Sequence, residues 1–242
     1  MTNQPITNQP RTDQTTSDEP IRPQLATEAR VGINSPHWSF EPFWMGERLL
    51  ARVADGDVRL TNAGGQPVDE FYRDLADILR TSVDADQAVL DGIWTAQPFL
   101  GHGSAAERWS EALADEAGDL PEDGPDPAEL ETRRAYVVVD LVELDGQFLG
   151  DLPYQERRRL LSGLVNESVR LRVTPSVKMP LASWFHAWQE NGFSRAVAKH
   201  ANSRYQPGTS NEDWIIITID PDRHPGVAGL FWKGRKKREI TR

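Results

Sequence analysis

The residues of greatest chemical interest lie in the run Phe-Glu-Pro-Phe-Trp-Met-Gly-Glu-Arg over residues 40–48. The run has the frame of a catalytic loop, in which a primary amine that can lose a proton would serve as a nucleophile. Its centre carries no such group, because the phenyl ring of Phe43 has no lone pair and Met45 has no charge. The sequence therefore predicts that the centre of this run cannot supply such a nucleophile.

This run resembles motif I of the ATP-dependent DNA ligases, which usually reads Glu-Pro-Lys-Trp-Asp-Gly, one more residue and then Arg. The resemblance aligns Glu41 and Arg48 with the glutamate and arginine of the family. In the family the lysine attacks the α-phosphate of ATP, and the matching position here is Phe43. The aspartate two residues later is replaced by Met45. The resemblance implies a ligase fold without the first chemical step of ligation.

The resemblance continues in the same order along residues 38–219. Residues 88–93 are similar to the Leu-Asp-Gly-Glu strand of the family, with Ile93 in place of a glutamate near ribose and metal. Residues 136–146 look like motif III, with Val139 in place of the aromatic residue that would lie over adenine. Order and spacing together make a chance match a poor explanation.

Two further matches follow towards the C-terminus. Residues 191–208 are similar to motif IV, with Ser194 at the metal-linked glutamate and Lys199 at a lysine in a supporting place. The last match is to motif V, where Ile216 and Thr218 replace two phosphate-binding lysines. The segments around these positions keep the family pattern, so the losses are concentrated at positions that carry chemistry.

Adenylylation relies on positioning and on electrostatic stabilisation of a charged phosphoryl transition state. The positions of nucleophile, metal or phosphate contact that have changed are Phe43, Met45, Ala63, Ile93, Ser194, Ile216 and Thr218. The resemblance leaves a degenerate nucleotide cleft at Glu41, Phe43, Arg48, Ile93, Val139, Ser194, Lys199 and Ile216. We therefore predict no catalytic residue, no cofactor and no metal site. In particular, Phe43, Met45, Ile93 and Ile216 are expected to converge on an apolar cleft floor.

The alternative is an active ligase or adenylyltransferase with a non-standard nucleophile, which would use ATP and magnesium. The lysines that could serve are Lys178, Lys199, Lys233, Lys236 and Lys237. Only Lys199 falls within one of the family motifs.

Composition limits the class of protein. The chain has 242 residues, a formal net charge of −10 and no cysteine. Disulfides and thiolate metal sites are thereby excluded, and a reducing cytoplasm is the expected compartment. No apolar run approaches the roughly 20 residues of a membrane span, so no membrane partner is expected.

The ends of the chain differ from its middle. Residues 1–31 are rich in Thr, Gln, Pro and Asn, and are predicted to be a disordered tail. Residues 115–131 combine acidic residues with Gly and Pro, which predicts a surface loop. The ligase-like domain is expected over residues 32–219, followed by a C-terminal extension over residues 220–242.

The pattern within the domain indicates an α+β fold. Strand-like runs are expected at 49–53, 136–141, 169–173 and 214–219, and helices at 69–79, 105–113, 155–165 and 183–190. The resemblance implies a DNA-ligase-type nucleotidyltransferase with antiparallel sheets flanked by helices. Residues after 220 are too few for the five-stranded OB barrel of the family, so that domain is expected to be absent or vestigial.

A dense basic run stands in the C-terminal extension, at Lys233, Arg235, Lys236, Lys237 and Arg238. It is either a phosphate-binding arm or a solvated tail, and with a net charge of −10 an arm would act only locally. The sequence thus predicts a pseudo-ligase with a binding or accessory role in DNA repair or replication, in a bacterial cell or a mobile element. Its partner would be DNA, through this basic run, or a repair or replication protein.

Overall fold

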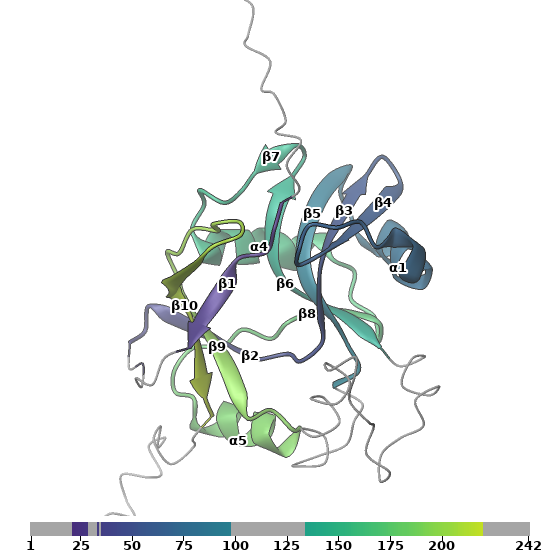
Figure 1. The fold of residues 1–242 in the computed structure, drawn as a ribbon. Helices are drawn as coiled ribbons and strands as arrows, with labels where there is room; N and C mark the ends of the chain where they lie inside the picture. Colours follow the sequence, from purple (N-terminus) through teal and green to yellow (C-terminus); the bar gives the residue numbers. More distant parts are fainter. Residues whose placement is uncertain (1–20, 29–32, 34, 98–133, 220–242) are drawn as a thin grey trace, which may run out of the picture.

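The computed structural model describes residues 21–28, 33, 35–97 and 134–219, and Figure 1 shows how they fold. Two β-sheets face each other, and helices cover their outer sides. The smaller sheet has the strand order β1-β10-β9-β2. The larger sheet has the order β4-β3-β5-β6-β7, with β8 paired to β6.

The strands of the smaller sheet are β1 (Leu25–Glu28), β2 (Trp38–Pro42), β9 (Arg195–His200) and β10 (Ser210–Thr218). The strands of the larger sheet are β3 (Glu47–Ala54), β4 (Asp57–Asn62), β5 (Gln87–Thr95), β6 (Ala135–Leu144), β7 (Gln147–Phe148) and β8 (Leu171–Val173). The helices are η1 (Asp69–Phe71), α1 (Arg73–Ser82), α4 (Tyr154–Leu164) and α5 (Ala182–Glu190).

Two tight turns in the larger sheet have the same local cause. Asp55 and Gly56 join β3 to β4 with φ angles of 51° and 81°. Asp145 and Gly146 join β6 to β7 with φ angles of 48° and 74°. Positive φ at both central residues is what a two-residue hairpin of matching twist requires, and Asp-Gly supplies it at low cost.

Three apolar clusters hold the layers together. On the outer side of the larger sheet, Leu75 and Leu79 of α1 and Leu161 of α4 are fully buried against the strands. On the outer side of the smaller sheet, α5 contributes Phe185 and Trp188 to a second cluster. A third cluster joins the inner sides of the two sheets, and its buried members are Leu50, Val89, Val142, Tyr205 and Trp214.

The predicted α+β class is confirmed, and the expected strands and helices in the described residues are present. The helix expected at 105–113 lies outside those residues, as does the acidic loop expected at 115–131. The expectation of antiparallel sheets needs a correction at two edges, because β1 pairs with β10 and β8 pairs with β6 in parallel. Each of these short strands joins a neighbour that is not adjacent in sequence, so no hairpin fixes its direction.

The predicted end of the disordered tail at residue 31 is also wrong. Leu25–Glu28 form β1, in which Leu25 pairs with Ser210 and Glu28 pairs with Ile216. The strand is stabilised by main-chain pairing with a part of the chain that is distant in sequence. Amino-acid composition carries no information about such pairing. Residues 1–20 lie outside the described residues.

Among the helices that the structure describes, none is long and apolar enough to cross a membrane.

Candidate functional site

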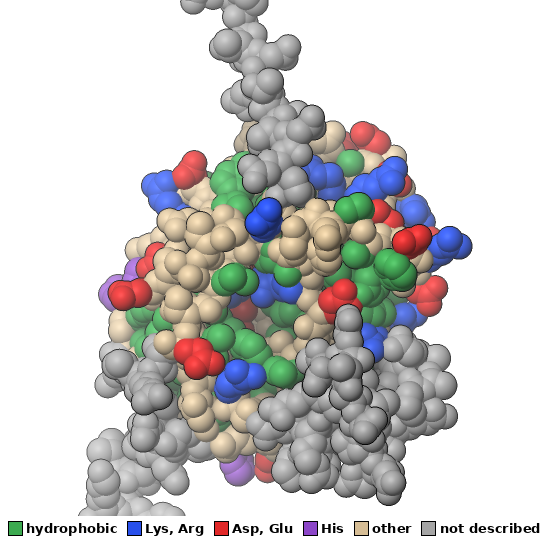
Figure 2. Space-filling view, viewed as in Figure 1, with side chains coloured by type: hydrophobic (Ala, Val, Ile, Leu, Met, Phe, Trp, Pro, Cys, Tyr) green, Lys and Arg blue, Asp and Glu red, His purple; other side chains and the backbone are tan. Residues whose placement is uncertain are grey.

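The positions singled out from the sequence lie on the facing sides of the two sheets. Side chains alternate between the two faces of a strand. On β9, Lys199 therefore shares a face with Arg195, and this face is opposite to that of Ala196 and Ala198, which pack with α5. On β5, Ile93 is directly opposite Arg48 of β3. Basic and hydrophobic side chains accordingly gather in a hollow between the sheets (Figure 2).

At the position of the family nucleophile, the ring of Phe43 is covered by a cation. The guanidinium carbon of Arg195 lies 4.3 Å from the centroid of the Phe43 ring. Its Nη2 lies 3.2 Å from the sulfur of Met45, and its Nη1 lies 4.0 Å from a carboxylate oxygen of Glu28 in β1. The main chains are also joined, because the Phe43 N–H donates to the Arg195 carbonyl over 3.0 Å. Arg195 thus closes the space in front of Phe43.

Glu41 is held by groups of the protein itself. Its side chain is almost fully buried, and its two carboxylate oxygens accept hydrogen bonds from the Tyr154 hydroxyl and from Lys199 Nζ, the latter over 3.0 Å. Lys199 Nζ also donates to the Val139 carbonyl over 2.7 Å and lies 4.1 Å from the Trp214 ring centroid. Glu41 and Lys199 therefore neutralise each other inside the fold.

Burial acts on both donors to Glu41. Burial raises the pKa of the Tyr154 hydroxyl, and the Glu41 carboxylate raises it further. The hydroxyl therefore stays protonated and continues to donate. Burial lowers the pKa of Lys199, and Glu41 opposes this shift.

Arg48 is anchored to the larger sheet. Its Nε and Nη2 donate to the two oxygens of Asp91 over 2.5 and 2.7 Å, a bidentate pair. Burial alone would lower the pKa of Arg48, but the Asp91 carboxylate outweighs it and raises this pKa. Asp91 also accepts a hydrogen bond of 2.7 Å from Tyr205. The arginine of the motif I match therefore serves the internal network of this chain.

A second bidentate ion pair is more deeply buried than the pair of Arg48 and Asp91. Arg157 of α4 donates to both oxygens of Asp140 in β6 over 2.9 Å, and both side chains are fully buried. The same guanidinium donates to the main-chain carbonyls of Leu152 and Ser203 over 2.6 and 3.0 Å. This pair fastens α4 and the segment after β9 onto the larger sheet.

The remaining predicted positions offer no charge. Ile93 and Val139 are buried, and Ile216 is half-buried on β10. Ser194 is half-buried, and its carbonyl accepts a hydrogen bond of 2.8 Å from the Ile219 N–H. The expectation of a purely apolar floor is therefore incomplete, because a guanidinium lies over Phe43.

The structure adds residues that the sequence argument passed over, namely Arg195, Glu28, Tyr154, Asp91 and Tyr205. Asp91 and Tyr205 stand within the matched motifs, which is a signal that could have found them. The basic run at 233–238 lies outside the described residues. Within the described ranges, no three His, Asp or Glu side chains gather in a way that could hold a metal ion.

The charged groups of the described cleft are engaged in contacts with other groups of the protein. In the described residues around Phe43, the cation is the guanidinium of Arg195, which stays protonated and cannot act as a nucleophile. The lysine amine present, Lys199, is buried between a carboxylate and a carbonyl. What the arrangement does provide is a set of satisfied polar contacts that join the two sheets.

Comparison with known proteins places these features in a family. The family model described as ATP dependent DNA ligase domain matches residues 23–217. The chain is 30% identical over 196 residues to the multifunctional non-homologous end joining protein LigD of Mycobacterium bovis, covering 81% of this chain and 23% of that protein. It is 27% identical to DNA ligase C1 of Mycolicibacterium smegmatis over 192 residues, covering 78% and 54%.

Solved structures agree. A mycobacterial DNA ligase D complexed with ATP and MES matches with 28% identity and a TM-score of 0.61, covering 84% of this chain and 61% of that one. The ligase domain of LigD from M. tuberculosis matches with 27% identity and a TM-score of 0.58, covering 84% and 60%. The chain thus spans less than two thirds of the length of each of these relatives. The expected ligase-type nucleotidyltransferase fold is confirmed.

Proposed function

We propose that this chain, which belongs to the family of ATP-dependent DNA ligase domains, is a ligase-like domain that does not form a covalent adenylate. The observation that carries the proposal is the pairing of Phe43 with Arg195. A phenyl ring stands where the family has its amine, and a guanidinium 4.3 Å from the ring centroid fills the space in front of it. Neither group can attack phosphorus.

The alternative function needs another lysine as the nucleophile. One feature of Lys199 favours that role, because burial lowers the pKa of its amine. Its surroundings argue against that role. Lys199 is 1% exposed, and its amine is held by Glu41 and the Val139 carbonyl and lies over the Trp214 ring. To attack a nucleotide it would have to leave these partners and expose a buried carboxylate. We therefore assign Lys199 a structural role.

A triphosphate would also find poor support in this cleft. Ile216 and Thr218 replace the two lysines implied by the resemblance to motif V. Ile93 replaces the glutamate of the Leu-Asp-Gly-Glu strand, and Ser194 replaces the glutamate of motif IV. Arg195 is a cation, but it is stacked on Phe43 and lies 4.0 Å from the carboxylate of Glu28, which repels phosphate. We propose that the chain uses neither ATP nor magnesium.

ATP is expected to leave the protein unchanged. Titration of the chain with magnesium and ATP should give no binding heat at micromolar concentrations, and the unfolding temperature should not move, because a ligand that does not bind cannot shift the folding equilibrium. The mycobacterial ligase D domain that was solved with ATP is the positive control. Micromolar binding of ATP by this chain would contradict the proposal that it does not use ATP.

The names of the relatives indicate the cellular process in which those proteins act. They are a multifunctional non-homologous end joining protein and DNA ligases. We propose that this chain works in DNA repair or replication as a binding or accessory component. Its partner is DNA, contacted through the basic run at 233–238, or a protein of the same process.

Deletion of residues 233–242 tests the DNA contact. If the basic run binds phosphates, the deletion should remove most binding to duplex DNA and flatten its salt dependence, since each neutralised phosphate adds about 0.9 to the slope of log affinity against log salt. Fluorescence anisotropy at several salt concentrations would measure this. Equal binding by the shortened and complete chains would refute the arm, and no binding by either would favour a protein partner.

A further inference from the structure

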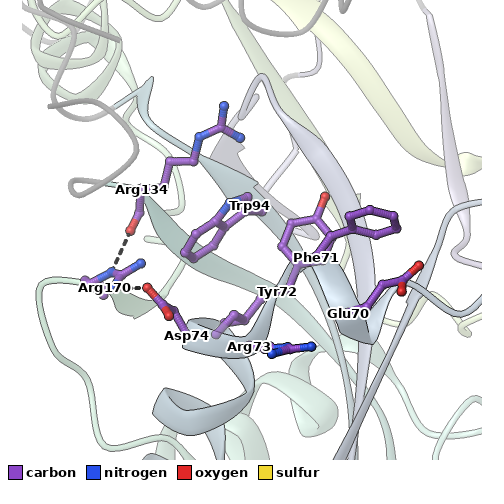
Figure 3. A pocket seen from close by; sticks show the side chains of 9 residues that line it. Glu70, Phe71, Tyr72, Arg73, Asp74, Trp94, Arg134 and Arg170 are labelled. Carbon is purple, nitrogen blue, oxygen red and sulfur yellow. Dashed lines mark hydrogen bonds and ion pairs between the residues drawn. The ribbon is translucent and has the colours of Figure 1, made fainter. Parts of the chain in front are cut away.

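A cavity of about 600 Å³ opens on the side of the larger sheet that faces away from the cleft, beside the start of α1 (Figure 3). Trp94 of β5 lines it, and Trp94 follows Ile93, whose side chain faces the cleft. Neighbouring residues on a strand point to opposite faces, so the sheet separates this cavity from the cleft. We refer to it as the Trp94 pocket. Its volume is within the usual range for ligand sites.

The apolar part of the Trp94 pocket is aromatic. Trp94 is 6% exposed, and the Tyr72 ring meets it edge-on, with centroids 6.3 Å apart and an interplanar angle of 84°. Phe71 lies at the rim and is 73% exposed, although it is a large hydrophobic residue. An exposed aromatic ring beside a concave surface offers contact area to a partner.

The polar part of the pocket is rich in donors. The guanidinium of Arg170 lies 5.5 Å from the Trp94 centroid and donates to the main-chain carbonyl of Arg134 over 3.3 Å. Its ion pair with Asp74 is long, at 3.6 Å, and the Asp74 carboxylate is 80% exposed. A better acceptor can therefore compete with Asp74 for the Arg170 guanidinium. Arg73 adds a further exposed cation.

These groups select for a carboxylate. Guanidinium and indole groups only donate, so the complementary ligand must accept, and a carboxylate can take two parallel bonds from one arginine. A nucleic acid strand fits less well, because Glu70 and Asp74 also line the pocket and the chain has a net charge of −10. A short protein segment can meet both signs of charge and still present one carboxylate to Arg170.

We propose that the Trp94 pocket binds an extended segment of a partner protein in which an aromatic side chain stands next to a carboxylate. The aromatic ring packs between Phe71 and Trp94, and the carboxylate is held by Arg170. This assignment does not depend on whether the cleft is catalytic, because the pocket lies on the other side of the sheet.

The test uses the full chain and a fluorescein-labelled peptide, Gly-Ser-Asp-Phe-Asp-Ser-Gly. We expect binding by anisotropy with a Kd of about 100 µM or tighter. The matched peptide with Asn in place of both Asp residues should bind at least about tenfold more weakly, since it lacks the charge-assisted bonds. Labelled single-stranded oligothymidine is the nucleic acid probe and should not bind at this pocket.

Two variants locate the site. Phe71→Ala and Arg170→Gln should each weaken peptide binding about tenfold, as expected for central contacts of an interface. The matched controls are Trp184→Ala, an exposed aromatic of α5, and Arg204→Gln, an exposed arginine between β9 and β10, and both should bind as the unmodified chain does. Phe71→Ala removes an exposed side chain and should stay folded, so the test holds even if Arg170→Gln is unstable. Absence of peptide binding, equal binding by Phe71→Ala, or tight oligothymidine binding lost in both variants would overturn the proposal.

Discussion

Replacing Lys199 with methionine should lower the free energy of unfolding by about 3 to 5 kcal/mol, because it removes one partner of a buried ion pair. Glu41 would keep the Tyr154 hydroxyl as a donor but would lose the amine 3.0 Å away. The Val139 carbonyl would lose its 2.7 Å donor as well. Methionine fills a similar volume, so little of the loss should come from a cavity. Urea unfolding followed by circular dichroism would measure it.

The matched control for this prediction is Lys178→Met, which removes an exposed lysine and should change stability by no more than about 0.5 kcal/mol. Adding Glu41→Gln to Lys199→Met should recover part of the loss, because no charge then stays buried without a counter-charge. A loss below about 1 kcal/mol for Lys199→Met would show that the lysine is not a structural part of the core and would reopen its candidacy as a nucleophile.

Phe43→Lys should fail to restore self-adenylylation. The new amine would stand beside the guanidinium that now lies 4.3 Å from the Phe43 ring centroid, so the like charge would lower the pKa of the amine and the cation–π contact would be lost. A neutral amine is a better nucleophile, yet nothing in the described cleft would steady the triphosphate and metal. The variant should also be less stable, by about 1 to 2 kcal/mol.

Further substitutions should be needed together before activity returns. They are lysines at Ile216 and Thr218 and glutamates at Ile93 and Ser194. The matched control for Phe43→Lys is Phe43→Met, which loses the ring without adding a charge. Covalent AMP on the single Phe43→Lys variant would show that a working phosphate site persists, and the chain would then be a recently inactivated ligase.

Most of the fold could be predicted from the sequence because its signals are local. The run that became β6 is rich in valine, and the second half of the run that became β10 contains three consecutive isoleucines, which favours strands. The sequence that became α4 begins directly after Pro153. The short strand β1 could not be predicted, because its four residues have no period of their own and are ordered by pairing with β10. Pairing between segments so far apart in the sequence produces no pattern within the residues of the short strand itself.

The candidate site could be predicted in its positions but not in its contacts. The resemblance to motif I identified Phe43 as a substitution, and residue type alone shows that a phenyl ring cannot act as a nucleophile. Nothing in the sequence shows that the Arg195 guanidinium turns onto the Phe43 ring, or that Glu28 from the N-terminal strand approaches it. Those contacts depend on strand order, because β9 lies between β2 and β10, and β10 in turn pairs with β1.

The most direct test of the central claim is incubation of the unmodified chain with magnesium and ATP labelled in the α-phosphate, followed by denaturing electrophoresis. The mycobacterial ligase D domain would serve as the positive control, and Lys199→Met would locate any label on the buried lysine. We predict no labelled band, because the amine is replaced by Phe43 and its approach is filled by Arg195. A labelled band that survives denaturation would contradict the account and establish an adenylyltransferase with a different nucleophile.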